Sequence, residues 1–447
     1  MTTDVTEAKP AGVGGESRPK QAGDIRARWA WVEPSVWTES MLKALETGVK
    51  GGQWFSLMDK VYSLRNLRAS FTDVKRNRGS AGVDHETIAQ FARDGEENLG
   101  RLHQALRDGR YVPQAVKRTW IPKPGSHEKR PLGIPTVRDR VAQTALRNVL
   151  EPIFERTFAE HSYGFRPGRG GKDALRRVWR LLHDGHPFVV DADLKSYFDS
   201  IPHDCLLERV KEQVSDGRVV ELLRAYLDQD VLDGMTRWTP EGGTPQGAVI
   251  SPLLSNIYLN PLDHLMAQRG LEMVRYADDF VLLCRTREEA EHALAEVQAW
   301  VAENGLTLHP DKTRIVDVRE PGGFDFLGYH FERGYKWPRR KSLQKLRDAL
   351  RAKTRRTNGY SLSEIIARVN PMLRGWFAYF QHSHGNVFPS VDGWMRMRLR
   401  SILRKRHRRK GRGRGADHQR WPNAYFADRG LFSMQQAHAS ANQSSCR

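Results

Sequence analysis

The stretch VRYADDFVLLC, from Val274 to Cys284, places two adjacent carboxylates between segments rich in valine, leucine, tyrosine and phenylalanine. Such apolar segments are typical of buried β-strands. Neighbouring aspartates repel each other, and each loses several kcal/mol of hydration on burial unless a cation compensates its charge. The pattern leaves two interpretations of Asp278 and Asp279: an exposed turn between two strands, or a metal site at the tip of a hairpin.

A second strand-like segment, HPFVVDADL (186–194), ends near another carboxylate, Asp193, and Asp199 follows a few residues later. Alternate residues of a strand share one face, so Asp191 and Asp193 point the same way. Divalent cations such as Mg²⁺ prefer carboxylate oxygens, and rigid strand ends hold these oxygens in place. Asp193 therefore favours the interpretation of the aspartate pair as part of a metal site.

Charge is concentrated in one part of the chain. The whole chain carries 72 Lys and Arg against 53 Asp and Glu, a net +19. Residues 333–415 alone contain 24 Lys and Arg but three acids, a net +21, so the remainder is close to neutral. Segregated positive charge is typical of a nucleic-acid footprint, although a merely solvated charged face is the alternative. Aromatic residues interleave with the arginines, so this segment can pack as well as bind.

The rest of the composition excludes several classes of protein. Three cysteines without a Cys-x-x-Cys pair support neither a disulfide framework nor a cysteine-rich zinc site. No apolar run approaches eighteen residues, so we expect neither export nor a membrane span. Strand signals around 114–140 predict a basic hairpin, capping signals predict a helix from Thr286 to about Gly305, and helical segments follow from about Ser342 to Lys410. The expected fold class is α+β.

Seven segments occur in a recognisable order: RPLGIPTVRDR (130–140), YGFRPGRG (163–170), DADLKSYFDSIPH (191–203), GGTPQGAVISPLLSNIYLN (242–260), YADDF (276–280), LTLHPDKT (306–313) and FDFLGYHF (324–331). Together they resemble the motif blocks of the bacterial group II intron-encoded reverse transcriptase/maturase family, over roughly residues 54–430. The resemblance implies a right-hand polymerase fold, with fingers and an antiparallel-sheet palm followed by an all-α thumb, also called the maturase domain.

The resemblance also implies roles by position. Asp193, Asp278 and Asp279 would be the catalytic carboxylates that bind two Mg²⁺ ions, or Mn²⁺, together with the backbone carbonyl of Leu194. Phe198 would be the steric gate that favours deoxynucleotides, and a core phenylalanine is the alternative. Other nucleotide contacts would come from Lys123, Arg130, Gln246, Gly247 and Lys312. Without the resemblance, the lysines and Arg130 would be surface charges, and TPQG (244–247) would be an ordinary turn.

The expected organisation is a disordered tail over 1–40, fingers over 41–185, a palm with the remaining fingers segment over 186–332, a basic thumb over 333–415 and a C-terminal tail over 416–447. The basic side chains that we expect to contact RNA phosphates are Arg396, Arg398, Arg400, Arg404, Lys405, Arg406, Arg408, Arg409 and Lys410.

The function implied is an RNA-directed DNA polymerase that also binds its group II intron RNA to assist splicing and mobility. Its partners would be that RNA, an RNA template with a DNA primer, deoxynucleoside triphosphates and target DNA. We expect a cytoplasmic protein that joins the nucleoid when it acts on DNA, and the sequence predicts no oligomeric state. Many relatives continue into an HNH-type endonuclease, which this chain lacks, so we expect nicked, replicating or single-stranded targets.

Two alternatives remain open. The first is a catalytically silent splicing cofactor that binds RNA and keeps only the fold, although all three aspartates and the TPQG loop are present. The second is a reverse transcriptase of a defence or diversity-generating system, which the maturase-like thumb disfavours.

Overall fold

The computed structural model describes residues 24–122, 129–411, 413 and 415–445. Its central sheet has four antiparallel strands in the order β6-β7-β3-β8. The two apolar segments that flank Asp278 form the β6–β7 hairpin, which confirms the predicted antiparallel palm. The strands are β3 (Phe188–Asp193), β6 (Glu272–Tyr276), β7 (Asp279–Cys284) and β8 (Arg314–Asp317).

The alternation along β3 separates two layers of packing. Val190 and Ala192 belong to the main core, whereas Val189 belongs to a second core on the opposite face of the sheet. This confirms the faces predicted from the period of two. The main core includes α12 (Ser251–Gln268) and α13 (Arg287–Glu303); the second includes α8 (Gly171–His183) and a sheet of β9 (Phe324–Phe326), β10 (Tyr329–Glu332) and β11 (Tyr335–Pro338).

The ends of α13 follow the predicted capping signals. The Thr286 side chain accepts a hydrogen bond from the Glu289 backbone N–H at 3.1 Å, and Gly305 follows the helix with φ of +66°. The Glu289 carboxylate accepts from the backbone N–H of Arg285 at 2.7 Å. Local capping therefore determines where this helix begins and ends.

The fingers are built from the N-terminal half and one palm insertion. Their sheet has the order β2-β1-β4-β5, and β1 pairs antiparallel with β2, which confirms the basic hairpin. Helix α7 (Val137–Glu155) buries most of its residues, and the buried set includes polar side chains such as Asp139 and Gln143. The other elements of the fingers are α1 (Ile25–Arg28), α2 (Glu39–Thr47), α3 (Met58–Tyr62), α4 (Leu64–Asn77), α5 (Ile88–Arg93), α6 (Gly95–Arg107), β1 (Val116–Pro122), β2 (Lys129–Ile134), β4 (Val231–Asp233) and β5 (Thr236–Trp238). The helices that follow the palm strand β3 and lead to β4 are α9 (Tyr197–Ser200), α10 (His203–Lys211) and α11 (Gly217–Leu227).

The expected disordered tail over 1–40 is wrong for residues 24–40, and residues 1–23 lie outside the described part of the chain. Trp37 is completely buried, and its indole N–H donates to the carbonyl of Asn148 at 2.9 Å. Val36 is buried beside it in the main core. The segment is anchored because a tryptophan buries a large apolar area while its polar N–H finds a partner.

The expected domain boundaries also shift. Helix α8 packs on the palm sheet before residue 186, and β11 extends that layer beyond residue 332. The predicted C-terminal tail over 416–447 is wrong for most of its length, because Trp421, Phe426 and Met434 are buried in the core of the thumb. We therefore propose a palm that begins with α8 and a thumb that runs from residue 339 to 445.

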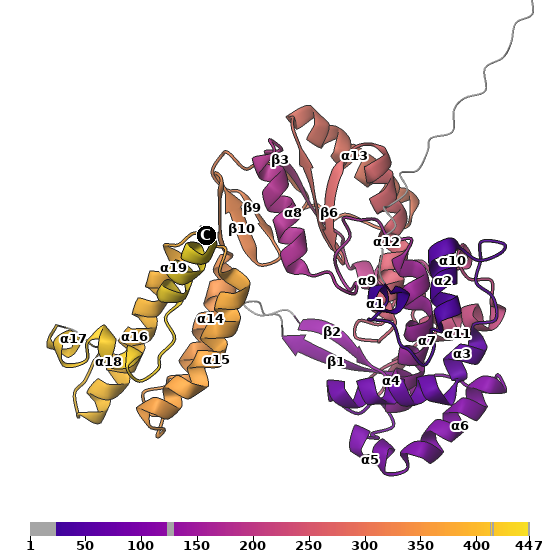
Figure 1. Ribbon diagram of the computed structural model, residues 1–447, viewed down its shortest axis with the longest axis horizontal. Coiled ribbons are helices and arrows are strands. Elements are labelled where there is room, and N and C mark those ends of the chain that lie inside the picture. Colours follow the sequence, from indigo (N-terminus) through magenta and orange to yellow (C-terminus); the bar gives the residue numbers. More distant parts are fainter. Residues whose placement is uncertain (1–23, 123–128, 412, 414, 446–447) are drawn as a thin grey trace, which may run out of the picture.

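The thumb contains helices and no strand among the residues that the structure describes. Figure 1 shows its helices gathered at one end of the molecule, with the fingers helices at the other and the palm strands between them. In the described ranges, none of the helices has the length and apolar character needed to cross a bilayer. The thumb helices are α14 (Arg340–Lys353), α15 (Leu362–Phe380), α16 (Val387–Arg406), α17 (Ala416–Arg420), α18 (Asn423–Ala427) and α19 (Met434–Ser445).

Candidate active site

The aspartate pair lies at the tip of the β6–β7 hairpin. Tyr276 and Asp279 are opposite each other in the ladder, so Ala277 and Asp278 form a two-residue turn. Ala277 adopts a left-handed conformation with φ of +61°. Both aspartates are partly buried, so the turn is not the exposed one that the sequence left open.

Asp193 lies directly beside this tip. The last pair in the β3–β7 register is Asp193 with Asp279, which brings together carboxylates that are 86 positions apart in the sequence. The ammonium group of Lys312 donates to the Asp193 carboxylate at 2.6 Å, and the backbone N–H of His309 donates to the Asp193 carbonyl at 2.7 Å. Lys312 is therefore part of the site and not a remote surface lysine.

Carboxylates crowd together at this tip, and the cations near them are Lys312, Arg314, Arg130, Arg275 and Arg339. Burial, with the charges of Asp278, Asp191 and Asp193, raises the pKa of Asp279 to about 7. Burial also raises the pKa of Asp278, an effect that Arg130 and Arg275 oppose. Negative charge crowded on oxygen ligands is what a hard divalent cation relieves, so the donor set fits Mg²⁺.

Over the described ranges, no three His, Cys, Asp or Glu side chains are grouped closely enough to hold a metal ion. The Asp193 carboxylate is instead bound to Lys312. Asp193, Asp278, Asp279 and the Leu194 carbonyl therefore stay predicted ligands. Leu194 itself is buried, and its backbone forms an isolated antiparallel β-bridge with Leu308, in the segment that carries Lys312.

The TPQG loop joins the palm to the fingers. The backbone N–H of Thr244 donates to the Phe198 carbonyl at 2.6 Å, and the Gln246 carbonyl accepts from the N–H of Gly133 in β2 at 2.6 Å. The Gln246 side chain lies 3.5 Å from Asp199. Asp199 thus contacts the loop through Gln246, whereas Asp193 lies against Asp279 and Lys312. The loop is an ordered connection between the two subdomains.

Gly247 has a structural role that the sequence did not indicate. Its φ is +105°, and a Cβ there would lie 2.7 Å from Leu132 Cδ1 and 2.8 Å from the Gly133 carbonyl oxygen. The glycine thus permits the chain's own strand β2 to approach closely. Its contact with nucleic acid stays a prediction.

We expect Gly247→Ala to destabilise the protein by about 1–3 kcal/mol, because the added methyl group meets β2 and the backbone is in a left-handed region. Thermal unfolding of the two proteins measures this effect. As a matched control, Gly393→Ala in α16 adds a methyl group where no atom lies within 4 Å. The packing explanation is wrong if Gly247→Ala unfolds at the wild-type temperature.

The remaining predicted nucleotide contacts surround the same region. Arg130 is exposed on β2, and its positive charge acts to lower the pKa of Asp278. Phe198 is partly buried on α9, packed edge-on against Tyr197 with ring centroids 5.4 Å apart. Lys123 lies outside the described residues. Phe198 also packs against the main core. Both interpretations of this side chain, the steric gate and the core phenylalanine, therefore stand.

Eight of the nine predicted RNA-binding side chains divide into two groups, and the ninth, Arg396, is partly buried and lines a separate recess with Asp392. Four of the eight donate hydrogen bonds within the thumb. Arg398 donates to Thr354, and Arg400 donates to the Trp421 carbonyl and to Asn423. Arg404 donates to Asp417 and to the Lys410 carbonyl, and Arg406 donates to the Tyr360 carbonyl. Arg400 is buried, so its predicted role in RNA binding is wrong, and Arg398 and Arg404 are largely engaged within the thumb. Four other side chains are exposed and line a recess of about 540 Å³ with Arg356: Lys405, Arg408, Arg409 and Lys410.

The sequence prediction missed Arg275, which lies next to the YADD motif. It is completely buried, and it bonds to α12 and to the hairpin turn. A charged residue inside an apolar strand, three positions before Asp278, was the available signal.

The chain matches two family descriptions in series. "Reverse transcriptase (RNA-dependent DNA polymerase)" matches residues 121–331, and "Group II intron, maturase-specific domain" matches residues 343–421. The first match contains all three aspartates, and the second covers most of the thumb.

Individual relatives give the same family. The chain is 34% identical over 349 residues to Protein YkfC of Escherichia coli (strain K12), which spans 69% of this chain and 86% of YkfC. It is 36% identical over 208 residues to Group II intron-encoded protein LtrA of Lactococcus lactis subsp. cremoris, which spans 46% of this chain and 34% of LtrA. The chain thus matches about a third of LtrA's length.

Among solved structures, the "Partial Cas6-RT-Cas1--Cas2 complex" aligns with a TM-score of 0.36 and 22% identity, over 55% of this chain and 41% of that chain. The family assignment rests on the sequence matches: two consecutive domains, and a relative that is matched over most of its length. The chain belongs to the group II intron-encoded reverse transcriptase/maturase family.

Proposed function

We propose that this reverse transcriptase extends a DNA primer on an RNA template from deoxynucleoside triphosphates, and that it binds its own group II intron RNA to assist splicing and mobility. The observation that carries the polymerase proposal is the pairing of Asp193 with Asp279 beside Asp278 at the hairpin tip. Two-metal nucleotidyl transfer needs such carboxylates on rigid strand ends.

Asp193, Asp278, Asp279 and the Leu194 carbonyl would hold two Mg²⁺ ions. When bound, these ions activate the primer 3′-hydroxyl and neutralise the triphosphate and the departing pyrophosphate. The protein's own part is positioning and charge. The ammonium group of Lys312, which donates to the Asp193 carboxylate, would supply positive charge toward the leaving pyrophosphate. Arg130 supplies positive charge on the fingers side of the tip.

We expect Phe198→Ala to relax discrimination against ribonucleotides by about 10-fold or more, because a smaller side chain leaves room for a 2′-hydroxyl, and steric exclusion of this size is worth about 1–3 kcal/mol. Single-nucleotide incorporation measures kcat/KM for a deoxynucleotide and for the matching ribonucleotide. Tyr62→Ala in α3, a partly buried aromatic side chain of the fingers, is the control for loss of packing alone. Unchanged sugar selectivity in Phe198→Ala would assign this phenylalanine to the core.

The exposed basic surface formed by the last turn of α16 and the segment after it carries the RNA-binding proposal. Lys405, Arg408, Arg409 and Lys410 gather around one recess with no carboxylate among the residues that line it. Phosphate contacts from such a surface give strongly salt-dependent binding without sequence readout. We propose that this surface holds the intron RNA, and that target DNA on the nucleoid is engaged by the same complex in the cytoplasm.

Two assays test the function. The first is extension of a DNA primer on an RNA template with Mg²⁺, and we expect full-length DNA. The second is splicing of the intron RNA that flanks the gene, and we expect faster splicing at low Mg²⁺ when the protein is added. Binding and splicing without DNA synthesis would favour the silent cofactor. DNA synthesis without any effect on splicing would favour a defence or diversity-generating system.

A further inference from the structure

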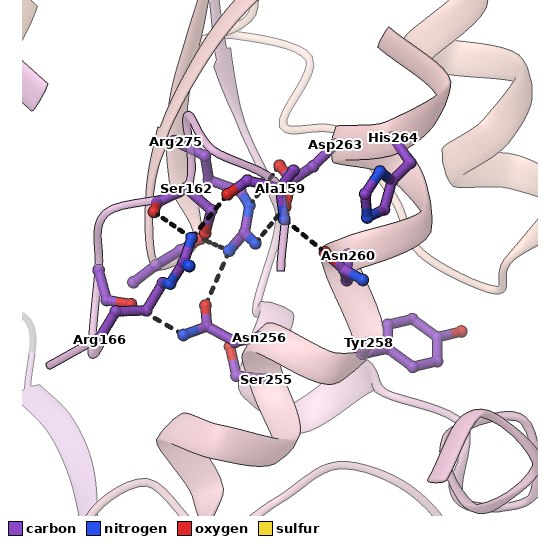
Figure 2. A network of polar contacts seen from close by, with 12 residues as sticks. Ala159, Ser162, Arg166, Ser255, Asn256, Tyr258, Asn260, Asp263, His264 and Arg275 are labelled. Atoms are coloured by element: carbon purple, nitrogen blue, oxygen red, sulfur yellow. Dashed lines mark hydrogen bonds and ion pairs between the residues drawn. The ribbon is translucent and has the colours of Figure 1, made fainter. Parts of the chain in front are cut away.

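Arg275 is a completely buried charge on β6, two residues before the hairpin turn. Its Nε donates to Asp263 Oδ1 at 2.8 Å, and its Nη2 donates to the other oxygen of the same carboxylate. Its Nη1 donates to Asn256 Oδ1 at 3.0 Å and to the carbonyl of Ala277 at 2.9 Å. Figure 2 shows the guanidinium between Asp263 and Asn256, both of which project from α12.

The same network reaches a third segment. The Asn256 side-chain amide donates to the Gly164 carbonyl at 2.8 Å, and a Cβ on Gly164 would lie 2.2 Å from the Ala277 nitrogen. The backbone of Arg275 also pairs with this loop, through His161 at 3.0 Å and Tyr163 at 2.8 Å. The hairpin turn is therefore held between α12 and the loop over 161–164.

A buried ion pair is weak evidence for a role in stability. Well-packed apolar residues of similar volume often replace a buried pair at no cost, or even with a gain. The property that an apolar side chain lacks is a planar fork of donors, which here bonds a carboxylate on α12 and a carbonyl in the turn at the same time. The bonded carbonyl belongs to Ala277, which has a positive φ and directly precedes Asp278.

We infer that Arg275 is a positioning residue for the polymerase reaction: with Asp263 and Asn256 it fixes the left-handed turn at Ala277, and so the places of Asp278 and Asp279 relative to Asp193. A non-glycine residue persists in such a conformation only where its surroundings over-determine it. Displacement of a reacting group by about 1 Å can cost 10²-fold in rate. The inference rests on the proposed function and names how the same site is held.

The test compares Arg275→Lys, Arg275→Met and Asn256→Ala with the wild type. Lysine keeps the charge beside Asp263 but cannot donate to three groups in a plane. Asn256→Ala keeps the ion pair and removes two bonds: the one that Asn256 donates to Gly164 and the one that it accepts from Arg275 Nη1. We expect kcat for primer extension to fall about 10-fold to 100-fold in both Arg275 variants and less in Asn256→Ala. The Mg²⁺ concentration for half-maximal rate should rise several-fold in each, and the affinity for RNA should stay within about 2-fold.

Arg209→Lys is the matched control. Arg209 is a partly buried arginine on α10 that bonds to the Tyr258 carbonyl and to Asn304, away from the hairpin. We expect this variant to lose stability without a change in kcat or Mg²⁺ requirement per folded molecule.

The outcomes separate the possible roles. Lower melting temperature with wild-type kcat and Mg²⁺ requirement in folded Arg275→Lys and Asn256→Ala would overturn the inference and leave Arg275 a purely structural residue. If Arg275→Met does not fold, these two variants decide the question. If wild-type protein makes no DNA at all, the proposed function fails instead, which is a distinguishable result.

Discussion

Asp279→Asn is expected to abolish primer extension, with a loss of at least ~10³-fold in rate, which corresponds to about 4 kcal/mol of barrier. The substitution keeps the shape of the side chain but removes the charge that a bridging divalent cation requires. Stability should not fall with activity. Burial and neighbouring carboxylates raise the pKa of Asp279 to about 7, so its charge opposes folding at neutral pH and a neutral amide relieves that effect.

Asp317→Asn is the matched control for this prediction. Asp317 lies on β8 of the same sheet and pairs with Phe188. Phe188 begins β3, whereas Asp193 ends it. We expect this variant to keep its rate of primer extension. The measurements are single-turnover extension and thermal unfolding of both variants. DNA synthesis by Asp279→Asn at the wild-type rate would mean that the chemistry lies elsewhere in the chain.

Replacement of Lys405, Arg408, Arg409 and Lys410 together by glutamine is expected to weaken binding of the intron RNA by about 10³-fold at 0.1 M salt. Each phosphate contact contributes roughly 0.7–0.9 to the slope of log affinity against log salt, so four contacts contribute about 3. All four side chains are exposed. The melting temperature should change little, because surface substitutions away from special features have small effects.

Arg400→Gln is the control, and we expect it to lower stability without changing the salt dependence of RNA binding. Arg400 lies on α16, as Lys405 does, but it is buried and donates to the Trp421 carbonyl at 2.9 Å and to Asn423 at 2.8 Å. Its loss leaves acceptors unpaired, so we expect destabilisation of about 1–3 kcal/mol with an unchanged salt slope. Filter binding across a salt series and thermal unfolding separate the two effects. An unchanged salt slope in the quadruple variant would mean that RNA binds on another surface.

Local patterns determined much of this fold in advance. The alternation in β3 predicted which residues face each core, and the apolar segments around Asp278 predicted the hairpin. The signals at Thr286 and Gly305 predicted the ends of α13. These predictions succeeded because strand period and helix caps depend on residues that are near in the sequence. The order of the motif blocks also singled out three aspartates that the fold brings together at the hairpin tip, and their catalytic role stays a prediction.

The errors concern partners that are distant in the sequence. Composition suggested a tail over 1–40, but Trp37 is buried against Asn148 in α7. The charge of α16 suggested one continuous RNA-binding surface, but Arg400 turns inward to Trp421. A run of arginines has the same sequence signature whether its side chains face solvent or the carbonyls of a neighbouring segment.

The sequence by itself determined which side chains are available for chemistry: three aspartates, their strand-like surroundings and a basic C-terminal region. Only the tertiary structure decided which groups each of these side chains contacts. The register of β3 against β7 pairs Asp193 with Asp279, β2 occupies the space beside Gly247, and α12 supplies the partners of Arg275. The physical reason is that periodicity and capping act over a few residues, whereas charge compensation and close packing depend on atoms that the chain brings together from far apart.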